Sequence, residues 1–225
     1  MKFPHPLAVG LAAVLAAGLP EPSQAGPNAN AKIILHLVPV VARRSVGCYS
    51  NIPKDSKSPV TAGDLKPQSY YAYVLVADFN AQEGLAGVQF GISYDDSAKV
   101  GVDIHSWQSC ALYEWPMDAW PASETGNLLT WNQAEDCQEK DPLSVGFFYL
   151  TAYSVDRFKL IPRPVDNLAV VAVCGLTASN NKDLVDTIIP ENLGWVDFGG
   201  GKGYNPWDPG QNLKNLQKRF KPLKD

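Results

Sequence analysis

The sequence is poor in the residues and motifs on which metal and catalytic sites depend. It has three histidines, of which only His36 and His105 follow the N-terminal segment, and none of its four cysteines forms a C-x-x-C pair. Neither a G-x-S-x-G nor an H-E-x-x-H motif occurs. A zinc site built from cysteine and histidine is therefore disfavoured, and we expect no catalytic residue, metal or cofactor.

The sequence also lacks an excess of basic residues and, after its first 25 residues, any apolar run of membrane length. Lysine and arginine number 19 against 23 acidic residues, which gives a net charge of −4. Such a balance does not attract phosphate backbones, so we expect no nucleic-acid partner. A composition with 45% hydrophobic and 19% charged residues is that of an ordinary globular protein, and we expect no transmembrane anchor.

Residues 1–25 have the pattern of a secretory signal peptide. Lys2 is followed by 13 apolar residues at positions 7–19, and the segment ends in the small-x-small sequence of residues 23–25. The apolar run is too short to remain as a membrane span. We therefore expect an exported, secreted or extracytoplasmic protein whose mature chain begins near Gly26.

The remaining chain fits one domain of about 200 residues. The alternative for the N-terminus, a buried helix, is disfavoured because Pro20 and Pro22 would end it. We assign residues 26–210 to a single β-sandwich domain and residues 211–225 to a basic C-terminal tail. That tail has apolar residues at helical spacing, so it is either a partner- or membrane-binding helix or a frayed end.

The four cysteines predict two disulfides, because an even number in an exported chain favours pairing. They are Cys48, Cys110, Cys137 and Cys174, and three pairings are possible. We favour Cys110–Cys137, which closes a local excursion, together with Cys48–Cys174, which ties an early strand to a late one.

Apolar and polar residues alternate in two consecutive runs, which is typical of half-buried β-strands. Residues expected to point inward are Val88, Phe90, Ile92, Tyr94, Val100, Val102 and Ile104. Other strands are predicted at residues 32–40, 70–79, 128–132, 145–153, 156–161, 168–174 and 193–198. Eight or nine short strands with long loops and no convincing internal helix predict an all-β, antiparallel, immunoglobulin-like sandwich.

Aromatic residues between Cys110 and Cys137 are the candidate binding residues. Tyr113, Trp115 and Trp120 lie there, and exposed aromatic rings stack on sugars or form hot spots in protein interfaces. Three further tryptophans on or beside predicted strands are expected to fill the core: Trp107, Trp131 and Trp195.

Residues 74–104 resemble the cohesin-like β-sandwich, a carbohydrate-binding-like architecture. The matching residues are Gly87, Val88, Phe90, Ile92, Tyr94 and Asp95. The chain is also similar to a set of exported bacterial proteins through Ser106–Cys110, Trp120–Pro121, Thr130–Trp131, Gly194–Gly199 and Gly203–Pro206. These resemblances imply a fold and an export route, and no binding residue is carried over from cohesins.

Three functions follow in order of preference. The first is a non-catalytic, exported sandwich that binds or scaffolds an extracellular protein or polysaccharide. The second is carbohydrate binding through Tyr113, Trp115 and Trp120. The third is an extracellular hydrolase, which would need acids such as Glu114 and Glu124 to converge in a cleft.

Overall fold

The computed structural model describes residues 26–43, 45–175 and 185–211. The predicted signal peptide lies outside these residues, as does the predicted basic tail from residue 212 onward. Among the described residues no helix is long and apolar enough to cross a membrane.

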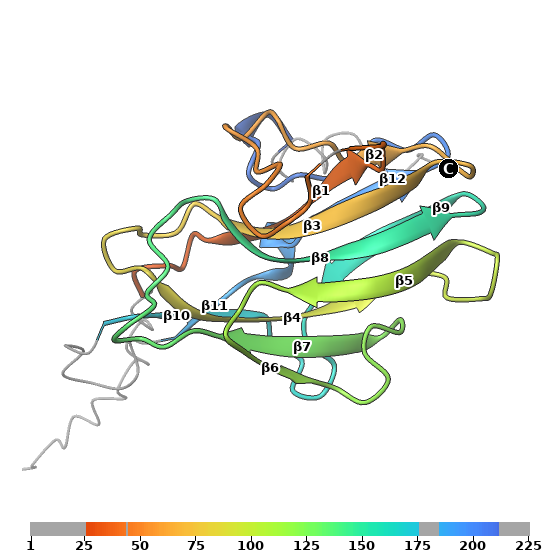
Figure 1. Ribbon diagram of the computed structural model, residues 1–225. Coiled ribbons are helices and arrows are strands. Elements are labelled where there is room, and N and C mark those ends of the chain that lie inside the picture. Colours follow the sequence, from red (N-terminus) through yellow and green to blue (C-terminus); the bar gives the residue numbers. More distant parts are fainter. Residues whose placement is uncertain (1–25, 44, 176–184, 212–225) are drawn as a thin grey trace, which may run out of the picture.

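The described chain forms two packed sheets of β-strands, with two one-turn 3-10 helices (Figure 1). Sheet A has the strand order β1-β3-β8-β5, and sheet B contains the remaining eight strands. The strands are β1 (Lys32–Pro39), β2 (Ala62–Gly63), β3 (Ser69–Ala77), β4 (Leu85–Ser93), β5 (Val102–Ser109), β6 (Tyr113–Pro116), β7 (Thr125–Thr130), β8 (Leu143–Ala152), β9 (Asp156–Ile161), β10 (Val170–Val173), β11 (Val185–Thr187) and β12 (Trp195–Phe198). The 3-10 helices are η1 (Pro190–Asn192) and η2 (Pro209–Gln211).

Strand β4, whose alternation is the clearest in the sequence, is central to sheet B. It pairs with β7 along one edge, while β10 and β9 share the other edge. β6 and β11 extend the sheet beyond β7 and β10, and β12 and β2 beyond β9. All these pairings are antiparallel except that of β12 with β2. The predicted all-β, antiparallel sandwich is confirmed.

The core lies between the inward faces of the two sheets. Val88, Phe90 and Ile92 of β4 are fully buried there, and Phe148 and Phe158 meet edge to face at 5.1 Å between ring centroids. Apolar residues at every second position of a strand bury one face of a sheet. The alternating pattern therefore explains how the two sheets pack.

Two sequence predictions about strands need correction. Val100 was expected to point inward, but it is exposed in the turn before β5, because the second run begins at Val102. In addition to the nine predicted strands, the structure contains three short strands that the sequence did not indicate, namely β2, β6 and β11. Each has two to four residues, which is too short to show a period.

The predicted cysteine pairing is wrong, although all four cysteines form disulfides. The bonds are Cys48–Cys110 and Cys137–Cys174, not Cys110–Cys137 and Cys48–Cys174. The loop after β1 crosses the outside of sheet A and brings Cys48 to the end of β5, where its Sγ lies 3.9 Å from the Ser109 carbonyl oxygen. The aromatic segment is thus not closed on itself but is tied at its two ends to different parts of the molecule.

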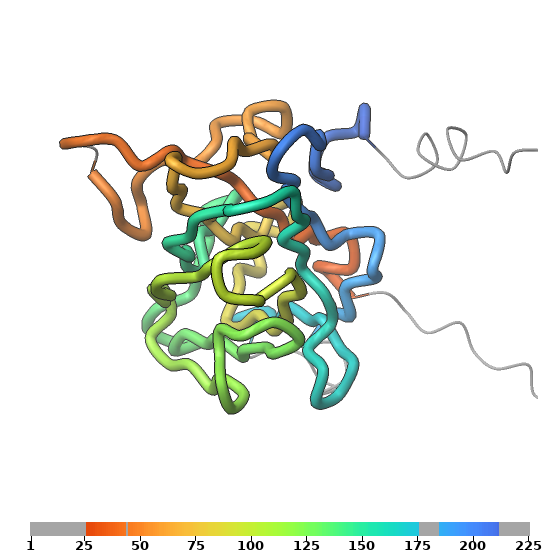
Figure 2. The backbone as a smooth tube through the Cα atoms, turned by 90° about the vertical axis from the view of Figure 1, so that its right-hand side faces the viewer, coloured from red at the N-terminus to blue at the C-terminus, as the bar shows by residue number. Residues whose placement is uncertain are grey.

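The chain covers the outer face of sheet A. Residues 45–61 and the segment after β12 lie over it and enclose a second apolar cluster: Ile34, Val38, Tyr73, Leu75 and Ala77, against which Ile52 and Trp207 pack. The Tyr73 hydroxyl lies 3.3 Å from the Asn51 side-chain nitrogen. Figure 2 shows this orange loop on the opposite side of the molecule from the cyan segment between β9 and β10.

Candidate functional site

Strand β6 places Tyr113 and Trp115 side by side on the outside of sheet B. Residues two apart in a strand share a face, and the two rings lie 6.1 Å apart with a 40° angle between their planes. Tyr113 is 56% exposed and Trp115 is 50% exposed. The structure therefore brings two of the three predicted binding residues together at the surface.

The residue between them, Glu114, holds β6 against the rest of the molecule. Its Oε2 accepts hydrogen bonds from Trp107 Nε1 and from the buried Asn127 Nδ2, each at 3.1 Å. A carboxylate that accepts two hydrogen bonds in this way orients the strand. The Tyr113–Trp115 pair is thus presented on a fixed support.

The aromatic pair belongs to a wider outward-facing surface, which we call the open face. It crosses five strands in two rows of register partners: Tyr113, Thr130, Gly87, Ala172 and Val185; and Trp115, Leu128, Gln89, Val170 and Thr187. Directly opposite residues in antiparallel strands point to the same side of the sheet. Val185, at the far end from Tyr113, is 51% exposed. The open face therefore has exposed apolar side chains at both ends.

A polar group occupies the centre of the open face. Gln89 donates from Nε2 to both carboxylate oxygens of Asp166, at 3.0 and 2.9 Å. Arg163 donates to the Gln89 side-chain oxygen at 3.4 Å and to the Trp115 carbonyl oxygen at 3.1 Å. The loop between β9 and β10 thus buries Gln89 and places a guanidinium group beside the aromatic pair. The sequence pattern did not indicate this, because Arg163 and Gln89 are 74 residues apart.

Trp120 does not join Tyr113 and Trp115. Its ring packs against Phe90, Trp107 and Phe148, with centroid distances of 5.5 to 6.0 Å. It therefore closes the edge of the core, and the expected three-residue binding surface contains only two of its members.

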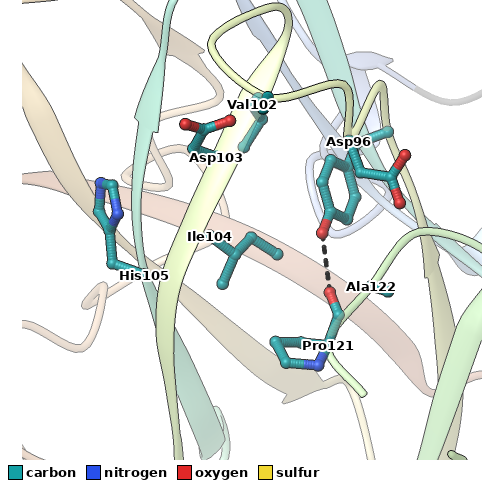
Figure 3. A pocket seen from close by; sticks show the side chains of 9 residues that line it. Asp96, Val102, Asp103, Ile104, His105, Pro121 and Ala122 are labelled. Carbon is teal, nitrogen blue, oxygen red and sulfur yellow. Dashed lines mark hydrogen bonds between the residues drawn. The ribbon is translucent and has the colours of Figure 1, made fainter. Parts of the chain in front are cut away.

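A shallow hollow of about 400 Å³ lies near this edge (Figure 3). Asp96, Asp103 and His105 line it, and the Tyr94 hydroxyl donates to the Pro121 carbonyl oxygen at 2.8 Å. Burial raises the pKa of Tyr94, and the negative charges of nearby aspartates raise it further. Because the hydroxyl stays protonated at neutral pH, Tyr94 does not act as a base there. Its hydrogen bond instead joins the end of β4 to the loop that contains Pro121.

The acids named for a hydrolase, Glu114 and Glu124, do not converge, and neither do the two histidines that follow the N-terminal segment. Glu114 is opposite Leu129, five residues along the chain from Glu124, which corresponds to roughly 16 Å along a strand. Glycosidase carboxylates lie about 5 to 10 Å apart. His36 and His105 lie on the two edge strands of sheet A, separated by three strand spacings or roughly 14 Å. No group of three or more potential metal ligands occurs among the residues that the structure describes.

Comparison with known proteins finds similarity in structure only. No protein-family model and no curated protein sequence matches the chain. The chain is similar to a cohesin module of a family 33 glycoside hydrolase from Clostridium perfringens, at 8% identity and a TM-score of 0.41, over 73% of this chain and 95% of the module. A structure titled as a type I cohesin–dockerin complex from Clostridium thermocellum gives 8% identity and a TM-score of 0.41, over 73% and 93%. Both structures contain cohesin modules, and the likeness to this chain is weak.

Proposed function

We propose that the protein is an exported, non-catalytic binding module that binds an extracellular protein through the open face. The observation that carries this proposal is the contrast between the two outer faces of the sandwich. The outer face of sheet A is covered by the chain itself, whereas on the outer face of sheet B Tyr113 and Trp115 at one end and Val185 at the other are half-exposed. Large apolar side chains left exposed on the surface, as Tyr113 and Trp115 are, mark candidate interaction sites.

The composition of the open face suits a protein partner. Tyrosine, tryptophan and arginine are the residues enriched in the energetic centres of interfaces, and Trp115, Tyr113 and Arg163 are adjacent here. The backbone support is rigid, because Glu114 fixes β6 and the Gln89–Asp166 bonds fix the covering loop. Binding would therefore cost little ordering entropy on the side of this chain.

Export is supported by two further features. The N-terminal segment has the signal-peptide pattern, and both disulfides require an oxidising compartment. A scaffold held by disulfides suits an environment outside the cytoplasm.

The experiment compares wild type, Trp115→Ala and a matched control, Tyr49→Ala, as immobilised baits for extracellular and envelope material. Tyr49 is the control because it is 81% exposed but lies in the loop over sheet A. A hot-spot tryptophan contributes at least about 2 kcal/mol, so affinity for the partner should fall about 30-fold in Trp115→Ala. It should be unchanged in Tyr49→Ala. Equal binding by all three proteins, or a loss only in Tyr49→Ala, contradicts the proposal.

The ring pair favours a second candidate, binding of a polysaccharide chain. Exposed tyrosine and tryptophan rings 6.1 Å apart offer two stacking surfaces, with the Arg163 guanidinium close by as a hydrogen-bond donor. Because the rings are tilted by 40°, a soluble, twisted glycan would contact both, whereas a flat crystalline polysaccharide would not. A glycan array probed with wild type and Tyr113→Ala distinguishes the candidates. Glycan binding that Tyr113→Ala abolishes supports this function, and an array without any signal excludes it.

A further inference from the structure

Asp186, in β11, has a buried carboxylate that lies beside the chain segment preceding β1. It lies in the middle of β11 as the register partner of Val171, so its side chain faces inward, and the residue is only 5% exposed. The backbone N–H of Asn28 donates to its Oδ2 at 2.8 Å. A carboxylate at this depth needs more than one amide donor to offset its lost hydration.

The described residues supply no cation to Asp186. Their ion pairs are Lys32–Asp78 and Arg157–Asp197, and Asp186 belongs to neither. The surrounding turn is nevertheless fixed. Asn28 is fully buried, and its side-chain oxygen accepts a hydrogen bond of 2.7 Å from the Asn80 N–H.

Gly26 lies directly against this carboxylate. A Cβ atom at Gly26 would overlap Asp186 Oδ1 and would lie 2.7 Å from Oδ2 and 2.8 Å from Cγ. Only glycine fits such a close approach, since the clash would be with a buried side chain. The Gly26 Cα atom is therefore next to the one buried charge that the surrounding described residues leave without an ion pair.

We propose that an endopeptidase cleaves the Ala25–Gly26 bond and that the α-ammonium group created on Gly26 forms an internal ion pair with Asp186. Water adds across the amide, so the C–N bond breaks, Ala25 leaves as a carboxylate, and the Gly26 nitrogen gains protons. The new group supplies a positive charge and three N–H donors. It therefore meets both needs of the buried carboxylate, and this assignment does not depend on the proposed binding function.

The ion pair with Asp186 forms only if the endopeptidase cleaves the Ala25–Gly26 bond itself. The amino nitrogen is bonded to Cα at about 1.5 Å, so a chain that begins at Gly26 carries its charge beside Asp186. One additional residue moves that charge about 3.8 Å along the chain and leaves a neutral amide in its place. The pair thus favours one mature N-terminus over its neighbours.

The first test is intact-mass and N-terminal peptide analysis of the full-length chain expressed in an exporting host. The expected mature protein begins at Gly26. A different dominant N-terminus, or secreted protein that retains residues 1–25, overturns the proposal.

The second test is a cycle of four proteins: chains that begin at Gly26 or at Ala25, each with Asp186 or with Asp186→Asn. Asparagine keeps an acceptor for the Asn28 N–H, so it removes chiefly the charge. We expect the Ala25 chain to melt about 5 °C below the Gly26 chain. Asp186→Asn should lower the melting temperature of the Gly26 chain and leave that of the Ala25 chain unchanged or higher.

An equal effect of Asp186→Asn in both chains overturns the ion pair. If the Asp186→Asn chains do not fold, the two chains that retain Asp186 still test the ion pair. Identical melting temperatures for the chains that begin at Ala25 and at Gly26 would also overturn it.

Discussion

Trp115 and Trp120 have the same local sequence, Trp-Pro, and opposite surroundings. Trp115 is on the outer side of β6, because it is one residue removed from Glu114, which faces inward toward Trp107 and Asn127. Trp120 follows a turn that returns the chain to the core, where Phe90 and Phe148 surround it. A dipeptide reports that a regular element is interrupted. It does not show on which side of the chain the ring lies. The sequence could therefore propose both tryptophans as binding residues, but it could not show that one is exposed and the other packs against the core.

His36 predicts how stability depends on pH. Burial lowers its pKa from 6.5 to about 4, and its Nδ1 accepts the Val60 N–H at 2.9 Å. In the unfolded chain the imidazole binds a proton below about pH 6.5, whereas in the folded protein it stays neutral down to about pH 4. The stability that it contributes is therefore complete above pH 6.5 and is lost as the pH falls toward 4.

His36→Asn should remove this part of the pH dependence, since asparagine keeps an acceptor for Val60 and does not titrate. Urea unfolding at pH 7 and pH 4.5 measures the difference. Wild type should lose up to about 3 kcal/mol more than the variant over this interval, from the shift in pKa at about 1.4 kcal/mol per unit. The same loss in both proteins would show that His36 does not titrate in this way.

At the scale of elements, the long alternating strands were predictable and the edge strand β6, which carries the proposed binding residues, was not. β4 and β9 match their predicted positions closely because apolar residues recur at every second place. β6 has four exposed residues and only one neighbouring strand, β7. Edge strands of this length have no buried face to impose a pattern. Tyr113 and Trp115 could therefore be proposed as binding residues from their chemistry, whereas their common face required the structure.

Each disulfide joins two structural elements, and the choice of partner for each cysteine depends on segments that are far apart in the chain. Loop length favoured a bond within residues 110–137, but the crossing of sheet A by residues 45–61 brings Cys48 to Cys110 instead. Chain entropy predicts that each bond stabilises the fold by about 4 kcal/mol, for separations of 62 and 37 residues.

Replacing both Cys48 and Cys110 by serine should lower the free energy of unfolding by about that amount. Because this bond anchors the loop over sheet A, the change should also speed proteolysis within residues 45–61. The Cys137→Ser, Cys174→Ser protein is the matched control. It should be destabilised to a similar extent, with its loop over sheet A cleaved no faster than in wild type. Faster cleavage of this loop in the control, and not in the first protein, would contradict the anchoring role.

For the whole molecule, the sequence predicted the sandwich but not which of its outer faces is free. Alternation of apolar and polar residues defines the inward side of each strand, but it does not show which segments cover the outward side. Ile34, Val38 and Tyr73 are buried on the outside of sheet A because a loop covers them. Among the residues that the structure describes, none covers the end of the open face at Tyr113 and Trp115, which are half-exposed. The difference arises from contacts between segments far apart in the chain, which no local pattern records.

Hydroxyl-radical footprinting of the mature protein, free and mixed with extracellular material, tests directly whether the open face binds a partner. The partner need not be identified beforehand, because protection is measured at individual side chains of this protein. If the open face binds the partner, Tyr113, Trp115 and Val185 should become protected, whereas Tyr49 over sheet A and Val155 in the turn between β8 and β9 should react as before. Protection of Tyr49 without change at Tyr113 and Trp115 would contradict it.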